Sequence, residues 1–235
     1  ESHKSPVVSV QMWVHTGSAD EKRGEEGLSH FIEHLVFKGT QKYHVGEIAS
    51  AIEGSGGELN AYTSFDQTVF YVTISKEFLE TGLEAISEMM GFPRFDEAEI
   101  DNEREVVIEE IKRGQDNPHR QASRLLFETI YKKHPYGIPV IGYDHVIRKV
   151  SKKKILNYYR ARYVPSNMTL VVVGNFDPKV IPGQVKSYFN DFKPYKLEKR
   201  ARKKELKQDK FRVQVQKSSF EESILYLAWK VPQVK

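Results

Sequence analysis

Two short strand-like segments, separated by a polar turn, constrain the fold of this chain more than any other feature. Residues 58–63 (ELNAYT) and 68–75 (TVFYVTIS) have the composition of β-strands, and residues 64–67 (SFDQ) are typical of a turn. This spacing predicts a β-hairpin, whose strands are necessarily antiparallel. Two further strands are predicted at residues 7–14 and 168–173.

Most of the remaining sequence has the periodicity of helices. Apolar residues recur at helical spacing, or follow helix-capping signals, in residues 28–37, 45–53, 78–90, 96–113, 118–131 and 151–163. Gly and Ser at residues 54–57 end the second helix, and without a following Lys-Ser/Thr they form a turn and not a phosphate loop. Because strands and helices do not alternate as repeated units, we expect an α+β fold with a mainly antiparallel sheet and helices packed on one face.

The chain is predicted to contain one large domain and the start of another. Its 235 residues, 39% of them hydrophobic, are sufficient for a sizeable core. Residues 194–210 are rich in Lys and Arg with few apolar residues, and residues 211–216 and 224–231 are strand-like. We therefore expect a first domain at residues 1–195, a basic linker at 196–210, and the first strands of a second domain at 211–235.

Composition excludes several classes of function. The net charge of +4 comes mainly from clusters at residues 152–154 and 193–210, without the interleaved aromatic residues of a nucleic-acid surface, so no nucleic-acid partner is expected. No apolar run approaches the roughly 20 residues that cross a membrane, so no membrane partner is expected either. The chain has no cysteine. Any metal must therefore be held by His and carboxylate side chains.

The segment His30-Phe-Ile-Glu33-His34 has the strongest chemical signature in the sequence. On a helix, His30, Glu33 and His34 share one face, and the nearly opposite face is apolar. Two imidazoles one turn apart can bind one zinc ion, and a carboxylate beside them can reach a water molecule on that ion. The alternative is a chance pairing of two His on a solvated face, which this composition would produce in only a few per cent of sequences.

A second predicted helix adds carboxylates of the right type. Its expected apolar stripe contains Ile100, Val106, Val107 and Ile111. Helical phase places Glu103 and Glu110 along this inward side and directs Glu105 and Glu109 away from it. An unpaired carboxylate taken out of water costs several kcal/mol, so an inward Glu requires a cation or a hydrogen-bond donor. The alternative is that these long side chains reach solvent from the edge of the stripe.

Six segments together resemble one family of zinc peptidases. The segments are GS (17–18), DE (20–21), GLSHFIEHLVFKGT (27–40), which contains the His-x-x-Glu-His segment, GELNAYT (57–63), HPYG (134–137) and YVPSNM (163–168). With Glu110 and Glu103 downstream, they resemble the pitrilysin, insulysin and mitochondrial-processing-peptidase family, the inverzincins. The resemblance extends over essentially the whole chain and is closest to bacterial relatives of the processing-peptidase β-subunit.

The resemblance implies a zinc-dependent endopeptidase that hydrolyses extended peptides or unfolded polypeptide segments. His30, His34 and Glu110 correspond to the ligands of one Zn²⁺, and Glu33 corresponds to the general base that acts on a zinc-bound water. Glu103 corresponds to the family's second carboxylate, which we expect to orient a ligand without binding the metal.

The same resemblance implies a binding site for extended peptides on an open sheet edge. An extended peptide would pair with the predicted strand through its main chain, and side-chain pockets would select its sequence. The expected substrate-binding residues are Gly57, Glu58, Leu59, Asn60, Ala61, Tyr62 and Thr63.

The family also implies a larger assembly. We expect a second homologous half or a partner subunit, in a homo- or heterodimer, and the bacterial cytoplasm or periplasm as the compartment. One alternative is a non-catalytic, peptide-binding subunit, although the presence of Glu33 favours the enzyme. Another is a non-hydrolytic zinc protein, which would need a fourth protein ligand. We expect His134 and His145 to be ordinary surface or capping residues.

Overall fold

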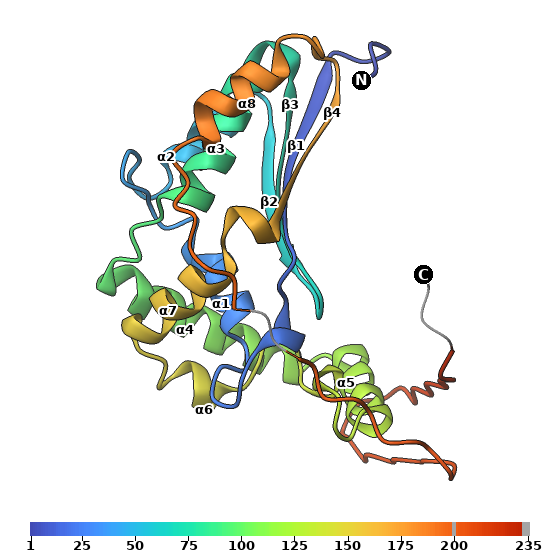
Figure 1. Ribbon diagram of the computed structural model, residues 1–235. Helices are drawn as coiled ribbons and strands as arrows, with labels where there is room; N and C mark the ends of the chain where they lie inside the picture. Colours follow the sequence, from blue (N-terminus) through green and yellow to red (C-terminus); the bar gives the residue numbers. More distant parts are fainter. Residues whose placement is uncertain (199–200, 232–235) are drawn as a thin grey trace.

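The computed structural model describes residues 1–198 and 201–231. The helices and four strands all lie within residues 7–189. The C-terminal segment, residues 201–231, extends away from them (Figure 1). In chain order the strands and α-helices are β1 (Val7–Val14), α1 (Leu28–Leu35), α2 (Glu47–Gly54), β2 (Glu58–Thr63), β3 (Thr68–Ser75), α3 (Leu79–Gly91), α4 (Glu97–Gln115), α5 (Pro118–Ile130), α6 (Asp144–Ile147), α7 (Lys152–Arg162), β4 (Met168–Gly174) and α8 (Ile181–Phe189). Four single 3-10 turns lie between them: η1 (Ser18–Asp20), η2 (Lys76–Phe78), η3 (Pro135–Gly137) and η4 (Pro165–Asn167).

The four strands form one antiparallel sheet in the order β2-β3-β1-β4. Val10 of β1 lies opposite Val72 of β3 on one side and Val172 of β4 on the other. The predicted α+β class and the antiparallel sheet are therefore confirmed. Strand β2 pairs only with β3 among the described residues, which makes it an edge strand.

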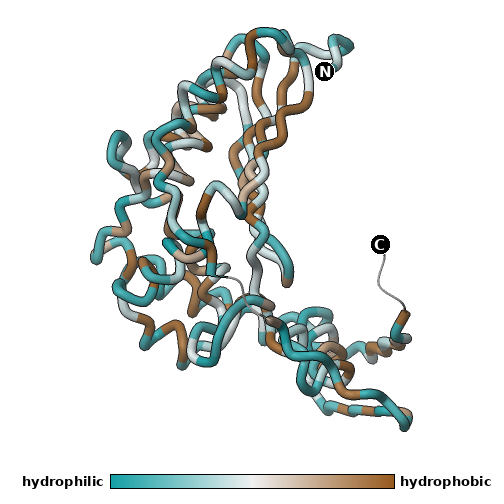
Figure 2. The backbone as a smooth tube through the Cα atoms, viewed as in Figure 1, coloured by the Kyte–Doolittle hydropathy of each residue, from teal (hydrophilic) through white to brown (hydrophobic). Residues whose placement is uncertain are grey.

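One face of the sheet carries the core. Alternate residues of β1 are buried, as the two-residue period of a strand requires. Helices α2, α3 and α8 lie on this face, and α3 packs against both β1 and β3 (Figure 1). Apolar residues are concentrated along the strands (Figure 2). Each large side chain buried there contributes about 1.5–3 kcal/mol to folding.

A second group of helices lies beside the end of the sheet. Helix α1 packs against α4, α7 and β2 (Figure 1). Arg104 of α4 anchors this group, because its guanidinium donates 3.0 Å to the Val150 carbonyl and also hydrogen-bonds to the Ile147 carbonyl. Tyr159 of α7 connects the group to α3 by a hydrogen bond to the Met90 carbonyl. Helix α1 thus lies between this group of helices and the edge strand β2.

The C-terminal prediction was wrong in one respect. The strands expected at residues 211–216 and 224–231 are irregular, although both ranges are described. Their apolar side chains are largely exposed, and within the described part of the chain no strand pairs with them. Alternating sequence alone does not stabilise a strand whose backbone groups have no partner strand. The assignment of residues 211–235 to a second domain stays a prediction.

Two smaller differences concern helices. Helix α6 was not predicted, because a four-residue helix has too few residues to show periodicity. The Asp177-Pro178 pair in the sequence predicts a helix that begins there, but Asp177 caps a turn through the Lys179 amide, 2.8 Å away, and α8 begins at Ile181. In the described ranges, no helix has both the length and the apolar composition needed to span a membrane.

Candidate functional site

Helix α1 separates a dry face from a polar face. Its apolar side chains Leu28, Phe31, Ile32 and Leu35 are buried in the core. His30 and His34 lie one turn apart on the other side, with their rings edge to face and their centroids 4.8 Å apart. The sequence therefore positions two imidazoles side by side at the border of the core.

A buried carboxylate caps the start of α1. Glu21 accepts hydrogen bonds from the amides of Gly27, at 2.8 Å, and Ser29, at 2.7 Å. Gly27 is left-handed, with φ 96°, and a Cβ there would lie 2.4 Å from the Ile141 carbonyl oxygen, so only glycine fits. Burial, opposed by these hydrogen bonds, raises the pKa of Glu21 to about 8. No local sequence pattern indicated this role of Glu21, which lies in one of the segments that carry the family resemblance.

Helix α4 faces α1 with two carboxylates. Glu103 is buried, with 7% of its side chain exposed, and Glu110 lies about two helical turns further along the same face, at the rim of the site. Glu105 and Glu109 point away and are exposed, as predicted from the helical phase. Val106 was wrongly placed in the buried stripe and is 49% exposed, because it lies about 100° around the helix from buried Val107.

Three of the predicted ligand side chains converge. Oε2 of Glu110 lies 3.5 Å from Nε2 of His30 and 3.8 Å from Nε2 of His34. All three donor atoms lie within 4.8 Å of one another, and in the described residues no other group of three or more such side chains does so. Donors about 2.1 Å from a tetrahedral zinc ion are about 3.4 Å apart, so this set fits zinc after small side-chain movements.

The pKa values of the two imidazoles shift in opposite directions. Burial, followed by the charges of His34 and Arg120, lowers the pKa of His30 to about 3, so its ring is neutral and can donate a lone pair. For His34, burial lowers the pKa, but the hydrogen bond to Glu103 and the nearby carboxylates outweigh it and raise the pKa. A carboxylate partner of this kind orients a metal-binding imidazole and increases its basicity.

Glu103 joins His34 to a lysine that sequence reasoning missed. One carboxylate oxygen lies 3.1 Å from Nδ1 of His34, and the other lies 2.7 Å from Nζ of Lys38. Burial alone would raise the pKa of Glu103, but the hydrogen bonds from His34 and Lys38 outweigh burial and lower the pKa. Lys38 follows α1 closely in sequence, but no local pattern indicated that it would reach a carboxylate on α4.

Glu33 lies where the helix meets the edge strand. Its carboxylate accepts a hydrogen bond from the hydroxyl of Thr63, the last residue of β2. Burial raises the pKa of Glu33 above its ordinary value, although the Thr63 hydrogen bond and the charge of His34 oppose this. A carboxylate with a raised pKa, beside a group of metal donors, is suited to take up a proton.

Strand β2 offers an open edge beside this carboxylate. Its residues Glu58, Leu59, Asn60, Ala61, Tyr62 and Thr63 alternate between exposed and half-buried. The Ala61 amide points away from β3 into the side-chain oxygen of Asn60, 2.8 Å away. Gly57, just before the strand, is tightly packed, since a Cβ there would lie 3.0 Å from Ile52, Ile74 and the Thr73 carbonyl.

The two histidines expected to be ordinary residues lie outside this site. His134 is the N-cap of η3, and its Nδ1 accepts a hydrogen bond from the Tyr136 amide at 3.2 Å, so it is a capping residue as predicted. His145 lies in α6 and stacks on Tyr143. Arg120 of α5, which was not predicted to matter, lies 3.8 Å from the outer oxygen of Glu110.

Comparison with protein families adds independent information. Residues 1–144 match the model for insulinase, peptidase family M16, and residues 149–235 match the model for the peptidase M16 inactive domain. The chain is 32% identical over 212 residues to an uncharacterized zinc protease, YmxG, of Bacillus subtilis, covering 86% of the chain and 52% of that protein. It is also 32% identical over 178 residues to an uncharacterized zinc protease of Streptomyces coelicolor, covering 76% of the chain and 39% of that protein.

Solved structures show the same fold. A protease from Helicobacter pylori aligns with a TM-score of 0.79 and 32% identity, over 87% of this chain and 49% of the other. The first half of the periplasmic protease PqqL from Escherichia coli aligns with a TM-score of 0.77 and 28% identity, over 85% and 44% respectively. The chain thus spans about half the length, or less, of the proteins it matches.

Proposed function

The chain belongs to the insulinase family of peptidases, family M16, and from that premise we propose that it is the zinc-binding half of an endopeptidase that cleaves extended peptides. Its relatives are named zinc proteases, which supports a zinc-dependent metallopeptidase. Because the chain covers about half of those relatives, the substrate and partners of the whole protein belong to the proposal.

We assign the metal to His30, His34 and Glu110. The convergence of their donor atoms and the neutral ring of His30 support this assignment. Glu103 orients His34 from its other nitrogen, and Lys38 holds Glu103 in place. Zinc held by these three side chains would polarise the scissile carbonyl and acidify a water molecule.

Glu33 is the proposed general base. Its carboxylate would take a proton from the attacking water and later return it to the leaving amine, and its raised pKa favours the uptake of that proton. The hydrogen bond from Thr63 holds the carboxylate in position. This bond is the observation that carries the proposal, because it places the base at the end of the open strand where an extended peptide would pair.

Substrate recognition is assigned to the edge of β2, by strand addition. An incoming peptide carbonyl would accept the Ala61 amide in place of the Asn60 side chain. Main-chain pairing of this kind gives affinity without strong sequence preference. It suits unfolded polypeptide segments or extended peptides as substrates.

The remaining machinery is assigned to a second, homologous half, in the same longer protein or in a partner subunit of a homo- or heterodimer. The solved relative described as the first half of PqqL and the match to an inactive domain support this arrangement. A non-catalytic, peptide-binding subunit is the alternative. The presence of Glu33 together with all three proposed ligands favours the catalytic member.

The experiment compares Glu33→Gln with Glu105→Gln, which removes an exposed carboxylate from the outer face of α4. Both variants, in the complete protein or in this chain combined with its second half, should retain one zinc ion by elemental analysis. Cleavage of a diverse peptide mixture should fall at least about 10²-fold for Glu33→Gln and stay unchanged for Glu105→Gln.

A third variant, His34→Ala, should lose zinc and activity together, because it removes one of three ligands. The proposal is wrong if the zinc-loaded wild type cleaves no peptide, or if Glu33→Gln cleaves as fast as the wild type.

A further inference from the structure

The turn of the β2–β3 hairpin is docked against the loop that follows β1. The carbonyls of Ser64 and Phe65 accept hydrogen bonds from the amides of Ser18, at 3.1 Å, and Ala19, at 2.9 Å. Gly17 allows this close approach, since a Cβ on it would lie 2.4 Å from the Ser64 carbonyl oxygen. The end of the peptide-pairing strand is thus attached to η1.

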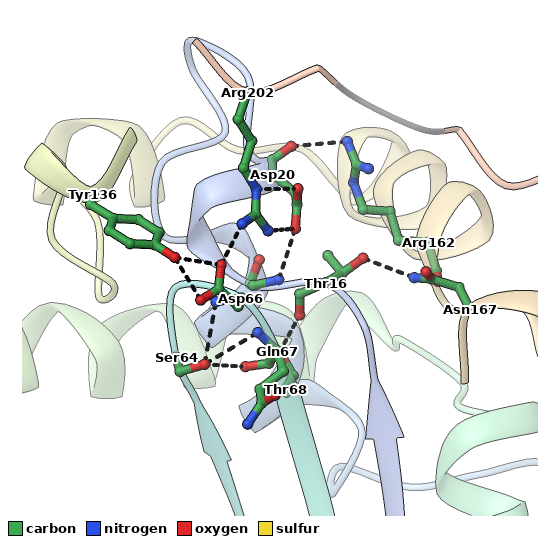
Figure 3. Close-up of polar contacts among 12 residues, drawn as sticks. Thr16, Asp20, Ser64, Asp66, Gln67, Thr68, Tyr136, Arg162, Asn167 and Arg202 are labelled. Atoms are coloured by element: carbon green, nitrogen blue, oxygen red, sulfur yellow. Dashed lines mark hydrogen bonds and ion pairs between the residues drawn. The ribbon is translucent and has the colours of Figure 1, made fainter. Parts of the chain in front are cut away.

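Arg202, from the segment after the helical domain, joins the two sides of this junction (Figure 3). Its Nε and Nη2 donate to the two carboxylate oxygens of Asp20, at 3.1 and 3.0 Å, and its Nη1 donates to Asp66 in the hairpin turn. Tyr136 donates to the same Asp66 carboxylate, at 2.8 and 2.7 Å. Figure 3 shows the guanidinium between the two carboxylates, with Tyr136 on the far side of Asp66.

Burial distinguishes the pair between Arg202 and Asp20 from an ordinary surface ion pair, whereas the side chain of Asp66 is half exposed. The side chain of Asp20 is 12% exposed and that of Arg202 is 30% exposed. Isolated pairs between fully exposed side chains contribute little, whereas bidentate pairs in a network with restricted solvent access contribute more. Arginine is suited to this role, because its planar guanidinium can hold two carboxylates at once.

The chain around Arg202 is fixed on both sides. Before it, the Glu198 amide donates to the Ala161 carbonyl at 3.0 Å, and Arg162 donates to the Glu198 carbonyl at 2.9 Å. After it, the Glu205 carboxylate accepts the amides of Lys133, at 2.8 Å, and His134, at 2.9 Å. Arg202 therefore lies between two residues, Glu198 and Glu205, that are each hydrogen-bonded to the helical domain.

We propose that Arg202 is a positioning residue that fixes the peptide-pairing edge strand from the segment leading out of the domain. Residues 201–205 set the position of the hairpin turn through Arg202, and the turn sets the end of β2 at Thr63 beside Glu33. The part of this inference that concerns peptide binding depends on the function proposed above. The attachment of the turn does not.

Hydrogen exchange tests the attachment directly in this chain. Arg202→Leu should speed exchange of the Ser18 and Ala19 amides about tenfold, because both donate to the hairpin turn. Lys204→Leu removes an exposed charge from the same segment and should change neither amide. Arg202→Lys keeps the charge but not the fork, and should give an intermediate rate. Equal exchange in Arg202→Leu and Lys204→Leu would overturn the proposal.

A double-mutant cycle tests whether Arg202 acts through Asp66. If it does, Arg202→Leu combined with Asp66→Asn should speed exchange little more than the more disruptive single change. Fully additive effects would mean that Arg202 acts elsewhere, and would overturn the proposal. Thermal unfolding of each variant confirms that the domain itself remains folded.

Peptide binding tests the consequence for β2. In zinc-loaded Glu33→Gln, adding Arg202→Leu should raise the Kd of an extended peptide about three- to tenfold and leave zinc affinity unchanged. Unchanged peptide affinity alongside faster exchange would overturn the positioning of β2. The proposed function fails if the Glu33→Gln variant binds no peptide, either as this chain alone or combined with the proposed second half. The exchange result still decides whether Arg202 holds the turn.

Discussion

The hairpin at residues 58–75 and the segment at residues 201–231 differ in structure despite similar sequence patterns. In the hairpin, Phe70 and Val72 are fully buried, Phe70 near the rings of Phe37 and Tyr163 and Val72 beside Gly82 of α3. In the segment, Phe211 is 85% exposed, and Val213 and Val215 are exposed as well. Both regions contain short runs rich in the β-branched and aromatic residues typical of strands, and residues 211–216 alternate apolar with polar residues. The difference shows that alternation specifies which face of a strand is buried, while a neighbouring strand determines whether a strand forms.

The two regions are also held to the molecule by different forces. Strand β3 lies between β1 and β2 and is stabilised by backbone pairing and apolar burial. The C-terminal segment is attached mainly through Arg202, Glu205 and Arg212, whose guanidinium donates 2.7 Å to the Ile130 carbonyl. Apolar burial is little affected by salt or pH, whereas charged contacts depend on both. The comparison can therefore be tested by core truncation, by pH and by salt.

Truncating one phenylalanine in each region should give the largest difference. Phe70→Ala removes a fully buried ring and should lower the free energy of unfolding by about 3–5 kcal/mol. Phe211→Ala, the matched change in the segment, should alter it by less than about 0.5 kcal/mol. Urea denaturation measures both.

The same pair can break the comparison when the second half is supplied. If residues 211–216 then join a sheet, Phe211→Ala should become costly in the assembly while remaining neutral in this chain. An equal cost for Phe70→Ala and Phe211→Ala in this chain alone would contradict the structural difference.

Local pattern was sufficient to predict the strands of the sheet and the two His that are proposed as metal ligands on α1. The bounds of β1, β2 and β3 follow from alternation and turn residues, and the shared face of His30 and His34 follows from helical spacing. The convergence of Glu110 with them was expected from helical phase and from family resemblance together. Val106 was misplaced because the predicted stripe included both Val106 and Val107. Adjacent residues point about 100° apart on a helix, and of these two only Val107 is buried.

Contacts between distant segments could not be predicted in this way. Arg202 lies 136 positions from Asp66, and Lys38 reaches Glu103 on a different helix. Neither pair leaves a periodic signal, because which charged side chains meet depends on how loops pack. Glu198, Arg202 and Glu205 lie in the range that composition assigned to a basic linker, yet each contacts a distant segment of the chain. No pattern in the sequence indicates these contacts.

Two carboxylates, Glu21 at the start of α1 and Glu205 in the C-terminal segment, should respond to pH in opposite directions. Glu21 and Glu205 each accept at least two backbone amides. Burial raises the pKa of Glu21 to about 8. For Glu205, burial is the largest single effect and raises the pKa, but hydrogen bonds from the amides of His134, Lys133 and Leu206 together outweigh it and lower the pKa to about 2.

The raised pKa of Glu21 means that the folded state keeps a proton which the unfolded state releases above its ordinary pKa of 4.5. Its contribution to stability is complete below that value and is lost as pH rises through about 8. Glu205 contributes fully above 4.5 and loses its contribution as pH falls toward 2. Between pH 5 and 8, therefore, Glu21 and not Glu205 should change how the free energy of unfolding depends on pH.

Urea unfolding at several pH values from 5 to 8 measures this slope. The difference in unfolding free energy between wild type and Glu21→Gln should shift steadily across the range, in favour of wild type at low pH. The difference between wild type and Glu205→Gln should stay constant. A flat difference for Glu21→Gln would mean that its carboxylate stays ionised in the folded protein.

The smallest expected effect concerns salt and the attachment of the C-terminal segment. Raising NaCl from about 0.05 to 0.5 M shortens the screening length to a few ångströms, which weakens the partly exposed pair between Arg202 and Asp66. Each such pair contributes at most about 1 kcal/mol, so trypsin should cleave within residues 201–231 about two- to fivefold faster at high salt. Cleavage within the sheet should not change, because apolar burial and backbone pairing are not screened. Trypsin activity on a small peptide at both salt concentrations gives the correction for the enzyme itself. The Lys204→Leu variant should keep the salt response. The Arg202→Leu variant should be cleaved quickly by trypsin at both salt concentrations. If salt accelerates cleavage equally in the sheet and the segment, the two regions are not held by different forces.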